Sequence, residues 1–200
     1  SIQNKYLVDF SAGILVIDSD NNTMSINKLI DRVILATKGK SELPGTNYTF
    51  YEDEFRQEYL QQANMENTMH KALATGEFLA YFQPKYDLIN NQIIGSEALV
   101  RWSSPINGFM QPDTFIPVFE RNGFISEIDL YMLEEVCKTL QARIANNYPI
   151  CPCSVNLSRV TLSKPDLVHS IMAIIEEYSI PSEYIEFEIT ENVFVNDFTS

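Results

Sequence analysis

The chain has 200 residues, 45% of them hydrophobic, which is enough for a packed core and excludes a disordered protein. It carries 27 acidic and 14 basic residues, for a net charge of −13, and no lysine- or arginine-rich run. General binding of DNA or RNA is therefore not expected. An anionic small ligand would need local help from metal ions or particular arginines, because the overall field repels it.

The sequence shows no membrane-spanning segment, since no run of about 18 apolar residues occurs. Residues 1–10 lack the pattern of a signal peptide. The three cysteines are an odd number without zinc or redox spacing, which indicates reduced thiols. We therefore expect a cytoplasmic segment without membrane contact, whose parent protein can carry an upstream sensory or membrane domain.

The first part of the chain predicts a small strand–helix–strand piece. Strands are expected at residues 11–18 and 47–52, with an amphipathic helix at residues 25–40 between them. Such a piece is too small to stand as a domain. A polar helical stretch, residues 53–75, follows and is typical of a connecting helix.

From residue 76 the pattern changes to alternating strands and helices. Residues 77–88 and 92–102 predict a β-hairpin. Strands are then expected at residues 151–158 and 184–190, and their spacing, near 32 residues, indicates parallel β/α units. Such units either close into a β/α barrel or form an open sheet. Both place the active site at the carboxyl ends of strands.

Two long helices are expected between these strands, each with a serine as its N-cap. The first covers residues 126–147, with Ser126 as cap and Asp129 three residues later. The second covers residues 163–179, with Ser163 as cap and Asp166 in the first turn.

Polar side chains stand late in three of the predicted strands. Strand alternation separates Glu97 and Arg101 from the apolar face formed by Ala98, Val100 and Trp102. Asn156 and Glu188 lie on the corresponding polar faces of the next two strands. Two carboxylates and an amide form a hard oxygen set suited to Mg²⁺ or Mn²⁺. The alternative is that each side chain faces solvent on a half-exposed strand.

The motif Glu97-Ala98-Leu99 within "QIIGSEALVRW", preceded by "YFQPKYDL", resembles the EAL domain family. The segments "PDTFIPVFERNGFI", "SVNLS" and "EFEITEN" follow in family order across residues 76–200. The resemblance implies an α/β fold, the first half of an EAL-type, TIM-like β/α barrel. It also implies an enzyme that hydrolyses the bacterial messenger cyclic di-GMP to linear pGpG with two Mg²⁺ or Mn²⁺ ions.

Carried over position by position, the resemblance assigns roles to six residues. Those expected to bind metal are Glu97, Asn156 and Glu188, those expected to contact the substrate are Gln83 and Arg101, and Glu191 is expected to support a ligand-bearing loop. Arg101 is matched to a phosphate contact. It lies on the same face as Glu97, about 13 to 14 Å along the strand, so one cleft can hold both.

The family site also needs an Asp-Asp pair, a lysine and a later glutamate, none of which occurs by residue 200. We therefore expect a piece of a longer phosphodiesterase that is inactive alone. Residues 1–52, with "SAGI", Asp31 seven residues before Lys38, and "GTNYTFYE", resemble the last third of a GGDEF domain. Leu35 stands where that family usually has tyrosine. The expected order is this remnant, a connecting helix at 53–75, and the EAL half at 76–200.

A second function class fits the same resemblance. It is a catalytically inactive EAL domain that acts as a cyclic di-GMP receptor or a protein-interaction module. Loss of any of the three expected metal ligands would have favoured it, and all three are present. The resemblance also leaves open a homodimer through the EAL domain.

Overall fold

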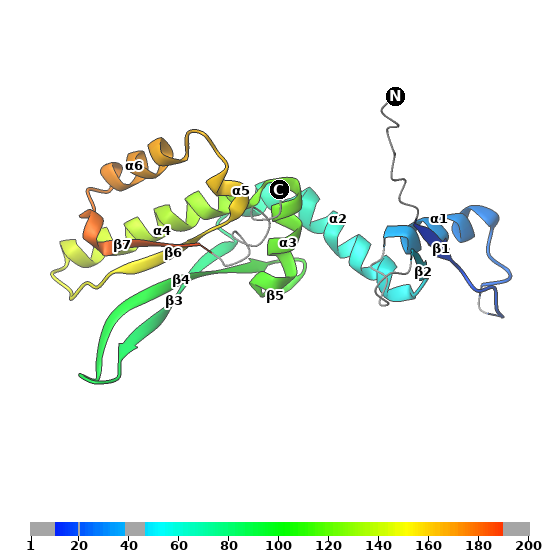
Figure 1. Cartoon of the computed structure of the whole chain (residues 1–200), viewed down its shortest axis with the longest axis horizontal. Helices are drawn as coiled ribbons and strands as arrows, with labels where there is room; N and C mark the ends of the chain where they lie inside the picture. Colours follow the sequence, from blue (N-terminus) through cyan, green and yellow to red (C-terminus); the bar gives the residue numbers. More distant parts are fainter. Residues whose placement is uncertain (1–10, 20, 39–46, 190–200) are drawn as a thin grey trace, which may run out of the picture. The chain divides into compact units, whose positions relative to one another are not determined.

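A computed structural model describes residues 11–19, 21–38 and 47–189 (Figure 1). The chain divides into two compact units, residues 1–64 and residues 65–200. Within the described ranges no helix is long and apolar enough to cross a membrane. The mixed α/β content predicted from the sequence is confirmed.

The first unit contains the predicted strand–helix–strand piece. Strand β1 (Ala12–Ile14) pairs in parallel with β2 (Tyr48–Phe50), and α1 (Ile26–Lys38) connects them. Both strands are shorter than predicted. Gly13 allows α1 to pass close to β1, because a Cβ there would collide with the carbonyl oxygen of Val33.

Helix α2 (Asp53–Ala74) contributes residues to both units. Its first turn contains Asp53 and Glu54, whose charges complement the positive end of the helix dipole. Asp53 also accepts a hydrogen bond of 3.1 Å from Arg32. In its second half, Met65 and Ala72 are buried in the core of the second unit.

The second unit is built on a five-stranded mixed sheet. Its strands are β3 (Phe78–Asp87), β4 (Gln92–Ser104), β5 (Gly108–Met110), β6 (Cys153–Leu157) and β7 (Ile185–Ile189). The order is β3-β4-β6-β7, with the short β5 pairing with β4. The β3–β4 pair is the predicted antiparallel hairpin, and β4, β6 and β7 are parallel as predicted. Strand β5 was not predicted.

Helices cover one face of this sheet. They are α3 (Pro112–Asn122), α4 (Ile125–Ala145), α5 (Arg159–Leu162) and α6 (Leu167–Glu177), with a short 3-10 helix at Ser182–Tyr184. Helix α4 packs along β6, and α6 packs against α4 (Figure 1). The β/α alternation predicted for this region is therefore present.

Five aromatic rings form the centre of the core beneath β4. They are Phe78, Trp102, Phe115, Phe119 and Phe124, each 2% exposed or less. Neighbouring ring centroids lie 4.9 to 6.0 Å apart in edge and tilted arrangements, which aromatic pairs prefer. The indole N–H of Trp102 donates a 2.9 Å hydrogen bond to Glu77. The cluster fixes the buried face of β4 and so the orientation of its polar face.

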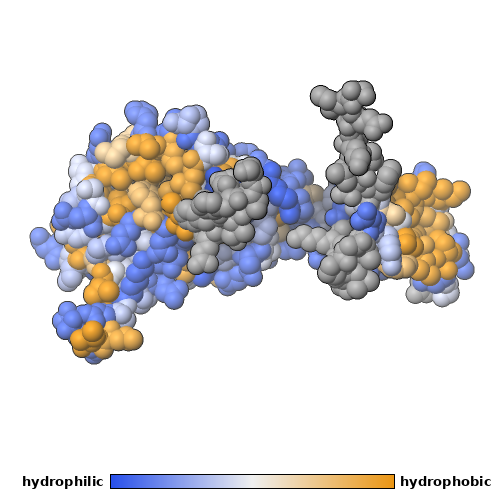
Figure 2. Space-filling model, viewed as in Figure 1, coloured by the Kyte–Doolittle hydropathy of each residue, from blue (hydrophilic) through white to orange (hydrophobic). Residues whose placement is uncertain are grey.

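The β3–β4 hairpin ends in a turn that exposes two apolar side chains. Leu88 and Ile89 are 90% and 92% exposed, and the end of the hairpin appears as an apolar patch in Figure 2. The carboxylate of Asp87 accepts hydrogen bonds from the backbone of Ile89, at 2.8 Å, and of Asn90, at 3.3 Å. These local hydrogen bonds stabilise the turn.

Both predicted serine N-caps are wrong. Helix α4 begins at Ile125, with Phe124 as the residue before it and Gly123 in a left-handed conformation, and Ser126 is buried in its first turn. The region predicted as one helix from residue 163 is instead two helices, since Ser163 ends α5 and α6 starts at Leu167. Pro165 lies between them and disfavours helical conformation in the residue before it.

Candidate functional site

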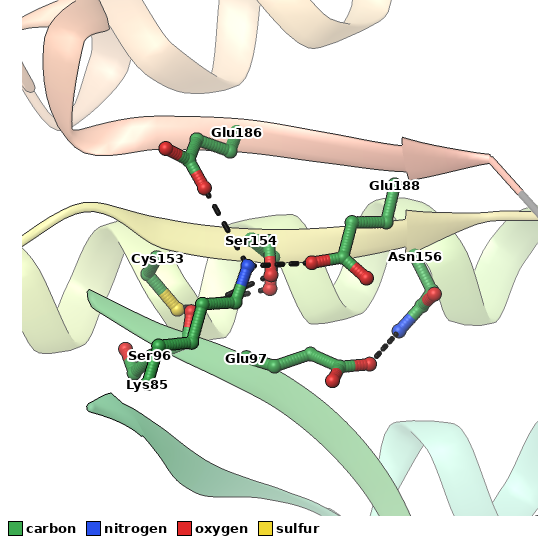
Figure 3. A network of polar contacts seen from close by, with 8 residues as sticks. All are labelled: Lys85, Ser96, Glu97, Cys153, Ser154, Asn156, Glu186 and Glu188. Atoms are coloured by element: carbon green, nitrogen blue, oxygen red, sulfur yellow. Dashed lines mark hydrogen bonds and ion pairs between the residues drawn. The ribbon is translucent and has the colours of Figure 1, made fainter. Parts of the chain in front are cut away.

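Strand register brings the three predicted metal ligands onto one face of the sheet. Glu97 pairs with Ser154, and Asn156 pairs with Glu188. Paired residues on neighbouring strands share a face, so these side chains gather on the face opposite the helices (Figure 3). The predicted separation of β4 into a polar and an apolar face is confirmed, because Ala98 and Trp102 are buried while Glu97 is only half-buried.

Glu97 and Asn156 are in direct contact. The amide nitrogen Nδ2 of Asn156 donates a hydrogen bond of 2.8 Å to Oε1 of Glu97 (Figure 3). Besides this bond, the amide oxygen of Asn156 and the second carboxylate oxygen of Glu97 accept no hydrogen bond from the residues that the structure describes. The pair therefore presents two oxygen atoms from two strands at one point of the face.

Glu188 is paired with a lysine that the sequence reasoning missed. Nζ of Lys85 lies 2.6 Å from Oε1 of Glu188 and 3.6 Å from Oε2 of Glu186. The hydrogen bond from Lys85, together with one from Ser154, holds the pKa of Glu188 below its usual range, and the same bond raises the pKa of Lys85. Lys85 follows Gln83 by two residues, so strand alternation was the signal that could have placed it on this face.

The two predicted substrate contacts lie on the same face of the β3–β4 hairpin. Gln83 is exposed on β3, directly opposite Glu97. The guanidinium of Arg101 lies 5.8 Å from the ring centroid of Tyr81, a cation–π distance, and donates a 2.8 Å hydrogen bond to the carbonyl of Val100. The predicted supporting residue Glu191 lies outside the described residues.

The donor types on this face fit a hard divalent cation. The oxygen atoms available here come from the carboxylates of Glu97 and Glu188 and from the amide of Asn156. Across the described ranges no three acidic, histidine or cysteine side chains gather as a metal cluster. Carboxylate and amide oxygens suit Mg²⁺ and Mn²⁺. A divalent ion bound at Glu188 would replace Lys85 as the positive partner of that carboxylate. The metal role of these residues stays a prediction.

A second polar cluster lies behind the face, where α4 passes the end of β6. Asp129 is 6% exposed and accepts hydrogen bonds from the backbone N–H of Ser158 at 2.8 Å and from the hydroxyl of Thr161 at 2.5 Å. Burial raises the pKa of Asp129. A cavity of about 210 Å³ lies beside it and is also lined by Asn156. The sequence had indicated Asp129 only as part of a helix cap.

Comparison with known proteins identifies the family. The family model described as "EAL domain" matches residues 66–200, more than half of the chain. The chain therefore belongs to the EAL domain family, as the motif around Glu97 predicted.

Similar proteins come from several bacteria. An uncharacterized protein of Synechocystis is 30% identical over 183 residues, which cover 90% of this chain and 26% of that protein. MucR of Pseudomonas aeruginosa, named as a bifunctional diguanylate cyclase and cyclic di-GMP phosphodiesterase, is 25% identical over 190 residues, covering 95% and 27%. The chain thus spans about a quarter of the length of these curated relatives.

Solved structures agree with the family assignment. A structure described as the MucR phosphodiesterase in complex with cyclic di-GMP matches with a TM-score of 0.62 and 28% identity. The match covers 67% of this chain and 54% of that one. The EAL-type fold predicted from the sequence is therefore supported for the second unit, while closure into a barrel stays a prediction.

Proposed function

We propose that this chain forms part of a cyclic di-GMP phosphodiesterase, whose EAL domain hydrolyses the cyclic dinucleotide to linear pGpG with Mg²⁺ or Mn²⁺. The observation that carries the proposal is the gathering of Glu97, Asn156 and Glu188 on one face of the sheet, with Glu97 and Asn156 already 2.8 Å apart. Relatives that are named as cyclic di-GMP phosphodiesterases support the substrate.

In this proposal each residue of the face has a defined task. Glu97, Asn156 and Glu188 would hold divalent ions, which supply a water of lowered pKa and offset phosphate charge. Arg101 would bind a phosphate oxygen through its planar N–H groups. Gln83, exposed opposite Glu97, would donate or accept a hydrogen bond to the nucleotide. Together these groups would orient an anionic ligand within an acidic protein.

Residues 1–52 fit the proposal as the C-terminal piece of a GGDEF domain. The parallel β1–β2 pair with α1 between its strands supports this assignment. The match to MucR also extends through 95% of this chain, and MucR is named as a diguanylate cyclase as well as a phosphodiesterase.

The test is hydrolysis of cyclic di-GMP by the whole protein, measured as pGpG release with Mn²⁺ and with EDTA. We expect Glu97→Ala to abolish turnover, while Glu176→Ala, which changes an exposed glutamate on α6, leaves it intact. Unchanged turnover in Glu97→Ala would exclude it as a metal ligand. Tight binding of cyclic di-GMP without hydrolysis would instead favour the receptor alternative.

A further inference from the structure

A buried carboxyl group on α4 lies close to the candidate site without belonging to it. Asp129 is 6% exposed and shares its cavity with Ile125, Ile128 and Met132. An ionised carboxylate among apolar side chains is unfavourable unless hydrogen bonds compensate it. The contacts of Asp129 therefore indicate what this side chain does for the protein.

Both hydrogen bonds to Asp129 end on the same oxygen, Oδ2. They come from the backbone N–H of Ser158 and the hydroxyl of Thr161. The hydroxyls of Ser158 and Thr161 lie 2.8 Å apart, and Oγ of Ser158 accepts a 3.2 Å hydrogen bond from the N–H of Thr161. These bonds join the first turn of α5 to α4.

The segment held in this way begins at Ser158, two residues after Asn156 and directly after the end of β6. The ladder between β4 and β6 ends at the pair Ala98 and Val155, so Asn156 lies beyond the last rung on that side. Leu157 is 4% exposed and packs toward the helices. Asn156 and Leu157 still pair with Glu188 and Ile189 of β7, but no rung ties them to β4. The approach of Asn156 to β4 therefore also depends on where the following turn is fixed.

We propose that Asp129 is a positioning residue for Asn156. By holding the backbone of Ser158 it fixes the exit of β6, and this keeps the amide of Asn156 within 2.8 Å of Glu97. The inference deepens the proposed function, since Asn156 is there a metal ligand. Partners that orient a metal ligand without touching the metal typically change metal affinity about 10- to 100-fold when mutated.

Two variants of Asp129 can show whether its hydrogen bonds or its charge matter for Asn156. Because Oδ2 accepts both bonds, the single oxygen of an amide can accept them too, so Asp129→Asn keeps the contacts and removes the charge. Asp129→Leu has similar size but no acceptor. Positioning through hydrogen bonds requires that the first variant behaves as the wild type and that the second does not.

The experiment follows the side-chain amide signals of Asn156 by ¹⁵N NMR in the full 200-residue chain. Asn156→Ala assigns these signals, and Glu97→Ala, which removes the acceptor, gives their position without the hydrogen bond. We expect Asp129→Leu to move the signals toward the Glu97→Ala position and, in the whole protein, to weaken Mn²⁺ binding about 10- to 100-fold. Asp129→Asn should leave the Asn156 signals and Mn²⁺ binding unchanged. The same holds for the control Asp113→Leu, at an exposed position on α3.

Thr161→Val provides a second variant, because it removes one of the two bonds and keeps the side-chain shape. We expect a smaller shift of the Asn156 signals in the same direction. Signals that stay at the wild-type position in folded Asp129→Leu, or in Thr161→Val, would overturn the proposal. A whole protein that does not bind Mn²⁺ would count against the proposed function, while the NMR comparison would still decide the role of Asp129.

Discussion

Replacement of Phe119 by alanine should strongly destabilise the second unit. Phe119 is 0% exposed, and its ring centroid lies 4.9 to 6.0 Å from those of Phe124, Phe115, Trp102 and Phe78. Truncation of a buried phenylalanine costs about 3 to 5 kcal/mol, through lost burial and the cavity that remains. Since a domain is stable by only about 5 to 15 kcal/mol, this is a large fraction of the total.

The measurement is urea unfolding followed by tryptophan fluorescence. Trp102 is the single tryptophan of the chain and lies within the affected cluster, 5.6 Å from the ring of Phe119. With a denaturant slope of about 2 kcal/mol/M, a loss of about 4 kcal/mol lowers the urea midpoint by about 2 M.

A matched control uses the same substitution at an exposed ring. Phe109 on β5 is 51% exposed, so Phe109→Ala should change the free energy of unfolding by less than about 1 kcal/mol. Equal effects of the two substitutions would show that burial in this cluster does not determine stability. Because β4 carries both Trp102 and Glu97, the result also tests what holds the strand on which the site is built.

Three further predictions concern titratable groups. Lys85→Met should raise the pKa of Glu188 toward its usual value in a carboxyl NMR titration, because it removes the hydrogen bond that lowers this pKa. In the wild type the pair contributes stability that is lost as the pH falls through the lowered pKa. A pKa of Glu188 that stays low in Lys85→Met would contradict this reasoning. Burial raises the native pKa of Asp129, so the wild type should lose stability relative to Asp129→Asn as the pH rises through that pKa. Urea unfolding at several pH values measures this. A difference in the free energy of unfolding between the two proteins that does not change with pH would contradict it. Burial raises the pKa of Cys137 to about 11, so iodoacetamide should modify the half-buried Cys151 first in mass spectrometry; preferential labelling of Cys137 would refute its burial.

The local sequence pattern was sufficient to predict most helices and strands and the polar face of β4. Alternation along β4 predicted that Trp102 is buried and that Glu97 faces the other side, and the structure agrees. It could not predict the contact between Lys85 and Glu188. These residues lie on β3 and β7, which are not neighbours in the sheet, and 103 positions separate them in the chain. Only the strand order brings them together.

The wrong helix caps have a related cause. A serine followed three residues later by an acid is typical of a helix N-terminus, but the same spacing also occurs inside a helix whenever two residues share a face. Here Asp129 bonds to Ser158, 29 residues away, and Ser126 is buried within the first turn. The partner that decides between the two structures belongs to another element, so the sequence window around the serine does not contain it.

The charges of the site face bear on the order in which ligands would bind. Three carboxylates, on Glu97, Glu186 and Glu188, face two cationic groups, on Lys85 and Arg101, and the protein as a whole carries a net charge of −13. A phosphodiester approaching this face alone therefore meets net repulsion. Divalent ions bound by Glu97 and Glu188 would reverse the sign of the local charge. If the proposed function is correct, cyclic di-GMP should consequently bind only after the metal, and EDTA should abolish binding as well as hydrolysis.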